Sequence, residues 1–341
     1  MLIVTIDSGT TNTRVRIWKG RTVIANACEA VGIRDTVKTG NQDRLIKGIK
    51  KALDLALGQI QDGPTLPQII VASGMITSEV GLCHLPHLTV PVSLKTLARG
   101  TISKTLPEIS PHPIWFIPGV KNSVADIGLH NYEMMDVMRG EEVETFGLLS
   151  QHKVDGPALI ILPGSHSKFI HIDEKHQIVS SATTMAGELL DVLTNQTILA
   201  NSLHHQFANE LDIEYLLKGA TACQQVGIAR SCFSVRILDL FTAASTNQKA
   251  NFLLGAALYS DLLAIKNSEA LALQKNITVI ISGKAIMKEA LAVLIKQDAS
   301  FTGEVILINE DPNSPFSGIG AIELMKEKIP NIIQKSVIDH H

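Results

Sequence analysis

The chain has 341 residues, with 45% hydrophobic and 18% charged residues and a formal net charge of −3. This length allows two domains that each bury a core, and the balance of residues excludes wholesale disorder. The near-neutral charge and the lack of any long Lys/Arg run argue against nucleic acid as a partner.

The cysteines and the apolar segments indicate a cytoplasmic protein without a membrane segment. The apolar stretch 253–265 is interrupted by Asp261 and is shorter than the ~20 residues of a membrane span. Met1 leads directly into a strand-like segment, so we expect no signal peptide. The four cysteines are scattered, as is typical of reduced thiols: Cys28, Cys83, Cys223 and Cys232.

The first half of the chain is predicted to form a mixed sheet covered by helix. Three closely spaced strands, at 2–6, 14–18 and 22–27, form an antiparallel meander. Apolar residues at helical spacing predict an amphipathic helix over 43–57. The continuous apolar run at 67–73 is typical of a strand buried in a parallel sheet.

The second half repeats this order of elements. Its pattern predicts strands at 158–162, 168–172, 177–181 and 277–281, and helices at 186–200 and 285–295. The sequence therefore predicts an α/β protein with duplicated mixed sheets flanked by helices around a central cleft. Functional loops are expected at the strand ends that face this cleft.

Two turns of small residues occupy equivalent places in the two halves, from Asp7 to Arg14 and from Pro163 to Lys168. Small residues let backbone N–H groups approach an anion, and an acidic residue at a strand end can hold hydrated Mg²⁺. The first turn fits an ordinary polar hairpin equally well. In the second turn, Lys168 fits a solvated strand residue, so backbone cradling is the predicted role.

A third candidate is the segment from Met138 to Glu142, which opens a predicted helix. A carboxylate in the first helical turn, just after Gly140, is suited to accept a proton from a sugar hydroxyl. Taken without context, the residues favour a simpler role, in which Glu141 and Glu142 only complement the helix dipole.

The order of these elements resembles that of the sugar kinases of the actin-like superfamily. More narrowly, the chain resembles the 2-dehydro-3-deoxygalactonokinase family between Ile6 and Ala321. The resemblance rests on the strings at 74–78, 115–119, 137–142, 163–168 and 187–189, and on the glycines Gly81, Gly283, Gly318 and Gly320.

The resemblance implies the two-lobed actin-like ATPase fold, which is ribonuclease H-like. An N-terminal lobe at 1–139 would carry the sugar-acid side and the first phosphate loop. Residues 140–341 would supply the connecting helix and the nucleotide-binding lobe. The implied activity is phosphoryl transfer from ATP, with Mg²⁺, to 2-dehydro-3-deoxy-D-galactonate, which gives the 6-phosphate in galactonate catabolism.

The resemblance also implies a role for each candidate residue. Glu141 would be the catalytic base, and Asp7 would hold Mg²⁺ through water. Met75, Ser78 and Arg139 would face the sugar acid. The nucleotide would be held by Asp7, by residues of the two turns and by one later glycine, namely Gly9, Thr10, Thr11, Asn12, Gly164, Ser165 and Gly283.

Four positions depart from the family's pattern: Ser8 where Trp is frequent, Ser165 where Thr is, Leu82 where an aromatic is, and His87 where Tyr is. Leu82 and His87 fall beside the expected sugar-acid pocket. Another sugar or keto acid, such as 2-keto-3-deoxygluconate, is therefore an alternative substrate. A second alternative is an actin-like nucleotide-binding regulator, which would not need Glu141. The sequence leaves self-association open.

Overall fold

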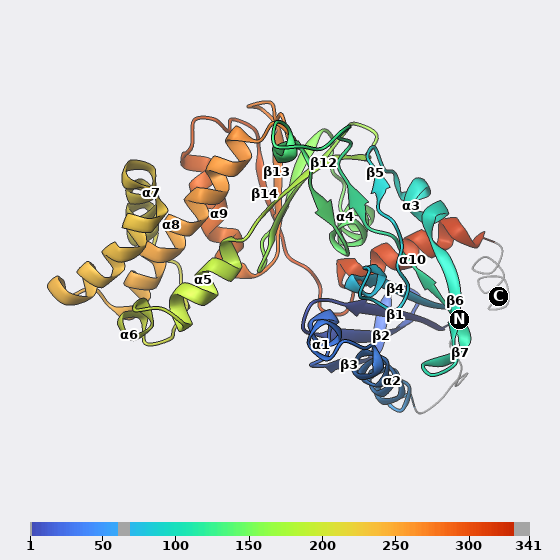
Figure 1. The fold of residues 1–341 in the computed structure, drawn as a ribbon. Coiled ribbons are helices and arrows are strands. Elements are labelled where there is room, and N and C mark those ends of the chain that lie inside the picture. Colours follow the sequence, from blue (N-terminus) through green and yellow to red (C-terminus); the bar gives the residue numbers. More distant parts are fainter. Residues whose placement is uncertain (1, 61–68, 331–341) are drawn as a thin grey trace.

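The computed structural model describes residues 2–60 and 69–330 and contains two larger sheets with helices around them (Figure 1). The strand predicted at 67–73 begins at Ile69, and its first two positions, Pro67 and Gln68, lie outside the described residues. Within the described ranges, no helix combines the length and apolar character that crossing a membrane requires.

The first sheet has six strands in the order β3-β2-β1-β4-β7-β6. Strands β1, β2 and β3 form the predicted antiparallel meander, whereas β4 pairs in parallel with both β1 and β7. Buried side chains of α1 and α2 form one core cluster with this sheet. The elements are β1 (Leu2–Ser8), β2 (Thr13–Lys19), β3 (Thr22–Glu29), α1 (Ile33–Thr39), α2 (Asp43–Leu57), β4 (Ile69–Gly74), β6 (Ile102–Leu106) and β7 (Ser110–Phe116).

The second sheet has five strands in the order β12-β11-β10-β13-β14. It repeats the first arrangement, because β10, β11 and β12 form an antiparallel meander and β13 pairs in parallel with β10 and β14. The predicted duplication is therefore confirmed. The strands are β10 (Ala158–Leu162), β11 (Ser167–Ile172), β12 (Ile178–Thr184), β13 (Thr278–Ser282) and β14 (Val305–Ile308).

Two helices, α4 (Glu141–Gln151) and α10 (Phe316–Lys328), connect the two sheets. Buried residues of both helices and of both sheets form one core cluster. The helices cross closely, since a Cβ added to Gly147 would lie 1.9 Å from the carbonyl oxygen of Phe316. The last helix also packs on β1 and β4, so the chain returns to its first sheet. The division at residue 139 stays a prediction.

A small three-stranded sheet, β5-β8-β9, links the larger parts. Strand β9 (Val137–Met138) runs directly into the start of α4. Asn122 fastens this region to β12, because its side chain donates to the carbonyl oxygen of Ser181 and accepts from the Ser181 N–H, both at 2.9 Å. The remaining elements here are η1 (Met75–Thr77), β5 (Leu88–Thr89), α3 (Leu94–Gly100), β8 (Val120–Lys121) and η2 (Tyr132–Met134).

Helices α5 to α9 pack on the second sheet and extend away from the first (Figure 1). The helix predicted over 186–200 is wrong at its end, because α5 stops at Asn195. The Thr197 hydroxyl donates to the Leu193 carbonyl oxygen and accepts the N–H of Leu199, which starts α6. The helices are α5 (Ala186–Asn195), α6 (Leu199–Leu203), α7 (Ile213–Phe241), α8 (Thr246–Asn267) and α9 (Ala285–Gln297).

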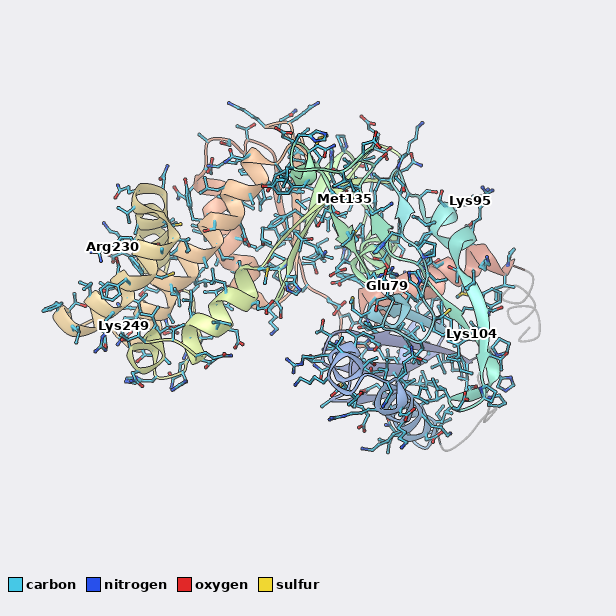
Figure 2. The ribbon with its side chains drawn as sticks, in the orientation of Figure 1. Glu79, Lys95, Lys104, Met135, Arg230 and Lys249 are labelled. Carbon is cyan, nitrogen blue, oxygen red and sulfur yellow. The ribbon has the colours of Figure 1, made fainter. Side chains whose placement is uncertain are left out.

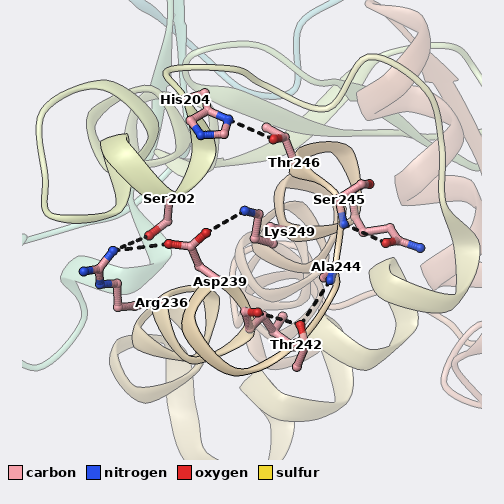
Figure 3. A network of polar contacts seen from close by, with 11 residues as sticks. Ser202, His204, Arg236, Asp239, Thr242, Ala244, Ser245, Thr246 and Lys249 are labelled. Carbon is pink, nitrogen blue, oxygen red and sulfur yellow. Dashed lines mark hydrogen bonds and ion pairs between the residues drawn. The ribbon is translucent and has the colours of Figure 1, made fainter.

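A polar network holds α6, α7 and α8 together (Figure 3). Asp239 accepts hydrogen bonds from Lys249 at 2.8 Å and Arg236 at 3.2 Å, and Arg236 also donates to Ser202. The hydrogen bond from Lys249 is the main reason that the pKa of Asp239 is lowered. In Figure 2, Lys249 and Arg230 mark this helical part, and Glu79 and Lys104 mark the part built on the first sheet.

Candidate active site

The first turn, residues 9–12 between β1 and β2, presents backbone donors to solvent. The Gly9 N–H donates to the carbonyl oxygen of Asn12 at 2.9 Å, and the carbonyl groups of Gly9 and Thr10 accept from the start of α1. Among the described residues, the N–H groups of Thr10, Thr11 and Asn12 have no hydrogen-bond acceptor. Consecutive free N–H groups of this kind form a site for an anion such as phosphate.

Asp7 lies at the end of β1, directly before this turn. Its side chain is 27% exposed, and one oxygen lies 3.7 Å from a guanidinium nitrogen of Arg14. Burial raises the pKa of Asp7, while Arg16 and Arg14 lower it. In the part of the chain that the structure describes, no three His, Cys, Asp or Glu side chains are grouped to hold a metal ion. A metal beside Asp7 would therefore need ligands from water and phosphate, as Mg²⁺ commonly does.

Two glycines bring the start of α4 to the ends of β1 and β4. Gly140 has φ 112° and Gly74 has φ 85°, backbone conformations that residues other than glycine rarely adopt. A Cβ on Gly140 would lie 3.5 Å from the Gly74 Cα, and one on Gly74 would lie 2.7 Å from the Ser8 carbonyl oxygen. Glu141 is therefore placed beside the Asp7 turn.

The two glutamates that open α4 differ in their surroundings. Glu142 is fully buried, both of its oxygens accept the N–H of Gly140, at 2.9 and 2.8 Å, and burial raises its pKa to about 8. Glu141 is half-buried, and one oxygen accepts the N–H of Arg139 at 3.1 Å. Burial raises the pKa of Glu141, and Lys168 lowers it. Glu141 is thus the glutamate that an incoming hydroxyl can reach.

The Arg139 guanidinium is held by residues far away in sequence. It donates to the Thr77 hydroxyl at 2.9 Å and to the Leu85 carbonyl oxygen at 2.7 Å, and it lies 3.4 Å from His87 Nδ1. Burial and Arg139 lower the pKa of His87 to about 4, so this imidazole is neutral at neutral pH. The result is a fixed cation beside neutral polar groups, which suits a carboxylate or a hydroxyl-rich ligand.

Met75 and Ser78 lie at the end of β4, close in sequence to Thr77. Met75 is half-buried, and the hydroxyl of Ser78 is buried without a hydrogen-bond partner. The structure thus brings these two predicted residues to the same segment as the partner of Arg139. Sequence reasoning gave Thr77 and His87 no contact with Arg139, because no local signal relates positions about 50 to 60 residues apart.

The second turn, at Gly164 and Ser165, lies against the start of α5. The Glu188 N–H donates to the Ser165 carbonyl oxygen at 2.9 Å. A Cβ on Gly187 would lie 2.0 Å from the carbonyl oxygen of Gly164, so only glycine allows this approach. The N-terminus of α5 is thus held next to the turn, and helix N-termini favour anions.

A cavity of about 390 Å³ opens beside the second turn. Its walls combine apolar side chains with a larger number of polar and charged ones, a mixture that can bind a small molecule. Gly283, with φ 146°, packs on Pro163, and Lys284 after it lines the cavity. The lining residues are Gly164, Ser165, Gly187, Leu190, Asp191, Thr194, Asn195, His205, Phe207, Lys284, Ile286 and Met287. Apart from the two turn residues, sequence reasoning assigned none of them a role.

Lys168 connects the second turn's hairpin to the segment that carries Arg139. Its ammonium donates to the Val137 carbonyl oxygen and to the Thr183 hydroxyl, both at 2.7 Å, and Thr183 donates to Asp136 at 2.9 Å. The interpretation of Lys168 as a solvated strand residue is wrong, since the residue is 7% exposed. We call these four residues, Asp136, Val137, Lys168 and Thr183, the Lys168 clamp.

The predicted site residues fall into two sets. One set lies where β1 and β4 end and α4 begins. The other set lies where β10 and β13 end and α5 begins. Among the described residues, no hydrogen bond joins the first set directly to Gly164, Ser165 or Gly283. Two sheets that each combine a three-stranded antiparallel meander with parallel strands, and that each carry a turn of small residues at a strand end, define the two-lobed actin-like fold.

Comparison with known proteins agrees with this class. The chain belongs to the 2-keto-3-deoxy-galactonokinase family, whose model matches residues 7–303. It is therefore a sugar-acid kinase, a phosphotransferase with an alcohol group as acceptor. No curated protein matches its sequence.

Among solved structures, the chain is similar to a protein from Sinorhizobium meliloti that is described as a candidate 2-dehydro-3-deoxygalactonokinase. The TM-score is 0.70 at 19% identity, over 97% of this chain and 99% of that one, which shows a shared fold. A weaker likeness, with a TM-score of 0.49 and 15% identity over 98% of both chains, is to the activator of 2-hydroxyisocaproyl-CoA dehydratase from Clostridium difficile, with bound ADPNP.

Proposed function

We propose that this kinase transfers the γ-phosphoryl group of ATP to the terminal hydroxyl of 2-dehydro-3-deoxy-D-galactonate and forms the 6-phosphate. The observation that carries this proposal is the pairing, at the start of α4, of a held guanidinium, Arg139, with a reachable carboxylate, Glu141. Arg139 can meet the carboxylate of the sugar acid, and Glu141 can meet the hydroxyl that is phosphorylated. Met75 and Ser78 would line the same side.

The nucleotide would lie across the second turn. The cavity of about 390 Å³ beside Gly164 and Ser165 is large enough for an adenosine group, and Lys284, which follows Gly283, forms part of its wall. The N–H groups of Gly164 and Ser165 and the start of α5 would hold phosphate from one side. The first turn, from Gly9 to Asn12, would hold it from the other. Asp7 would hold Mg²⁺ through water, and this ion would neutralise charge on the phosphates.

In the transfer step, Glu141 accepts the proton of the substrate hydroxyl as its oxygen bonds to the γ-phosphorus. The bond from this phosphorus to the bridging oxygen breaks, and ADP leaves. Positioning carries most of the catalysis, because phosphoryl transfer needs little covalent help. The first and second turns lie on different sheets, so we expect both ligands together to bring the lobes closer and to exclude water.

The division into lobes at 1–139 and 140–341 belongs to this proposal, with α10 packing on the first lobe. So does a cytoplasmic location, which suits four cysteines that are all free. The expected partners are the two small-molecule substrates.

A coupled ADP-release assay over a panel of acids and aldoses tests the proposal. We expect the highest kcat/KM with 2-dehydro-3-deoxy-D-galactonate and poor turnover of glucose and glycerol, because a half-buried guanidinium without its carboxylate partner is costly. Arg139→Lys, which keeps the charge but loses the paired donors, should raise KM for the acid more than for ATP. Equal turnover of neutral aldoses would refute the assignment of Arg139.

Two other outcomes would select the alternatives. A preference for 2-keto-3-deoxygluconate would mean that the residues around Arg139 and His87 select the opposite hydroxyl configuration. Nucleotide binding without phosphorylation of any acid in the panel would indicate a regulator. A further variant, Asp7→Asn, should weaken the Mg²⁺-dependent binding of ATP, measured by calorimetry, and unchanged affinity would remove Asp7 from the ion site.

A further inference from the structure

Three polar side chains with buried oxygen atoms lie behind the second turn. Asp261 on α8 is 1% exposed, and its Oδ2 has no hydrogen-bond partner. The hydroxyl oxygens of Ser167 and Thr184 are likewise buried and unpartnered. Ser167 and Thr184 are directly opposite each other on β11 and β12, so their side chains share one face of the sheet.

The three groups converge on one point. Burial raises the pKa of Asp261 to about 7, and hydrogen-bonding contact with the Thr184 and Ser167 hydroxyls lowers it. These contacts fall outside good hydrogen-bond geometry, so Asp261 Oδ2 and both hydroxyl oxygens lack a well-formed partner within the described parts of the chain. Unpaired buried oxygens are costly, and a carboxylate is the costliest of them, so such a group calls for a ligand.

We propose that Asp261, Ser167 and Thr184 bind a monovalent alkali cation. One carboxylate and two neutral hydroxyls supply a single negative charge, which a K⁺ or Na⁺ ion balances. Mg²⁺ fits this set poorly, because it retains several waters in a strict octahedral arrangement. An entry path exists, since Asp261 and Thr184 also line a cavity of about 460 Å³ between α5 and α8.

The position of this cation site explains what the ion would do. Ser167 begins β11 directly after the second turn, and Thr184 ends β12 two residues before α5 begins. An ion shared by both residues and by α8 would fix the two segments that present phosphate-binding N–H groups. The cation is therefore a positioning element for the nucleotide side, separate from the Mg²⁺ proposed at Asp7.

Thallium(I), a mimic of K⁺ with an NMR-active nucleus, tests the site without any catalytic readout. The protein is dialysed into choline nitrate and titrated with thallium(I) nitrate, and ²⁰⁵Tl spectra are recorded with and without competing KNO₃. We expect a broadened, shifted thallium signal that KNO₃ reverses. Replacing choline nitrate with KNO₃ at constant ionic strength should also raise the thermal midpoint of unfolding by a few degrees.

Asp261→Asn should abolish both responses, whereas Asp54→Asn, at an exposed ion pair on α2, should keep them. If Asp261→Asn does not fold, Thr184→Val removes one ligand and should weaken thallium binding. With substrates present, KCl should lower KM for ATP about fivefold or more and leave KM for the acid unchanged.

A wild-type protein that binds no thallium, or a response that persists in both site variants, would overturn the proposal. Because the thallium and unfolding measurements use no ATP and no sugar acid, they stand or fall separately from the proposed kinase reaction.

Discussion

Replacing Glu141 with Gln separates proton transfer from structure at the start of α4. The Gln amide oxygen can still accept the Arg139 N–H, which Glu141 accepts at 3.1 Å, so folding and ligand binding should persist. The variant loses the basicity that the hydroxyl needs. General-base help is typically worth ~10²- to 10⁴-fold, and we expect kcat to fall by about this factor while both KM values stay close to wild type.

Glu142→Gln is the matched control, one position along the same helix. Burial raises the pKa of Glu142 to about 8, so this carboxyl group is largely protonated at neutral pH and resembles the amide of Gln. The hydrogen bond from Gly140 survives on one oxygen. We expect a loss of about 1 kcal/mol or less in the free energy of unfolding, and a fall in kcat of under about tenfold.

The pH profile gives a second test of the same assignment. Glu141 must be ionised to accept a proton, so wild-type kcat should fall as the pH drops through its pKa. Because burial raises this pKa, the loss should begin above the ordinary value of 4.5, and Glu141→Gln should lack that limb. The assay is coupled ADP release, with urea unfolding of each variant. If Glu142→Gln is the inactive variant, or neither loses tenfold, the reasoning about Glu141 is refuted.

Three further changes test how the site is held. Gly140→Ala forces a residue with a side chain into φ 112°, so it should cost ~1–3 kcal/mol of stability and most of kcat. The control, Gly40→Ala, lies at φ 71° with open space around it and should cost stability alone. Equal kcat in both variants would contradict the role of Gly140. Lys168→Met opens the Lys168 clamp and should lower kcat about tenfold or more in the coupled assay, and an unchanged kcat would remove the clamp from catalysis. Asp239→Asn leaves the Lys249 ammonium, which is 6% exposed, without a carboxylate partner. Urea unfolding should therefore show a loss of ~1–3 kcal/mol in the free energy of unfolding, with kcat unchanged. No such loss would mean that the network of Figure 3 does not stabilise the helices.

The sheets could be predicted because their signals are local. The meander at 2–29 has closely spaced alternating strands, and β4, β10 and β13 are continuous apolar runs, which buried parallel strands require. The start of α4 was also predictable from Gly140 and the acidic residues after it. The end of α5 was not, because the Thr197 hydroxyl competes for backbone groups only in the folded chain.

The positions of the candidate residues in the fold were predictable where they depend on chain order and were missed where they depend on packing. The two turns and Glu141 follow from the order of elements. The partners of Arg139, by contrast, come from Thr77, Leu85 and His87, which only the fold brings near. Lys168 gave no sequence signal of burial, because its two acceptors come from different segments.

The position of the phosphate in the product shows whether the chain phosphorylates the C6 hydroxyl of the sugar acid. The protein is incubated with 2-dehydro-3-deoxy-D-galactonate, ATP and Mg²⁺, and the product is analysed by ³¹P–¹H correlation NMR. We expect a phosphorus signal coupled to the two hydrogens of C6, formed at the rate at which ADP is released. A phosphate on any other carbon, or ADP release that yields only inorganic phosphate, would contradict this expectation.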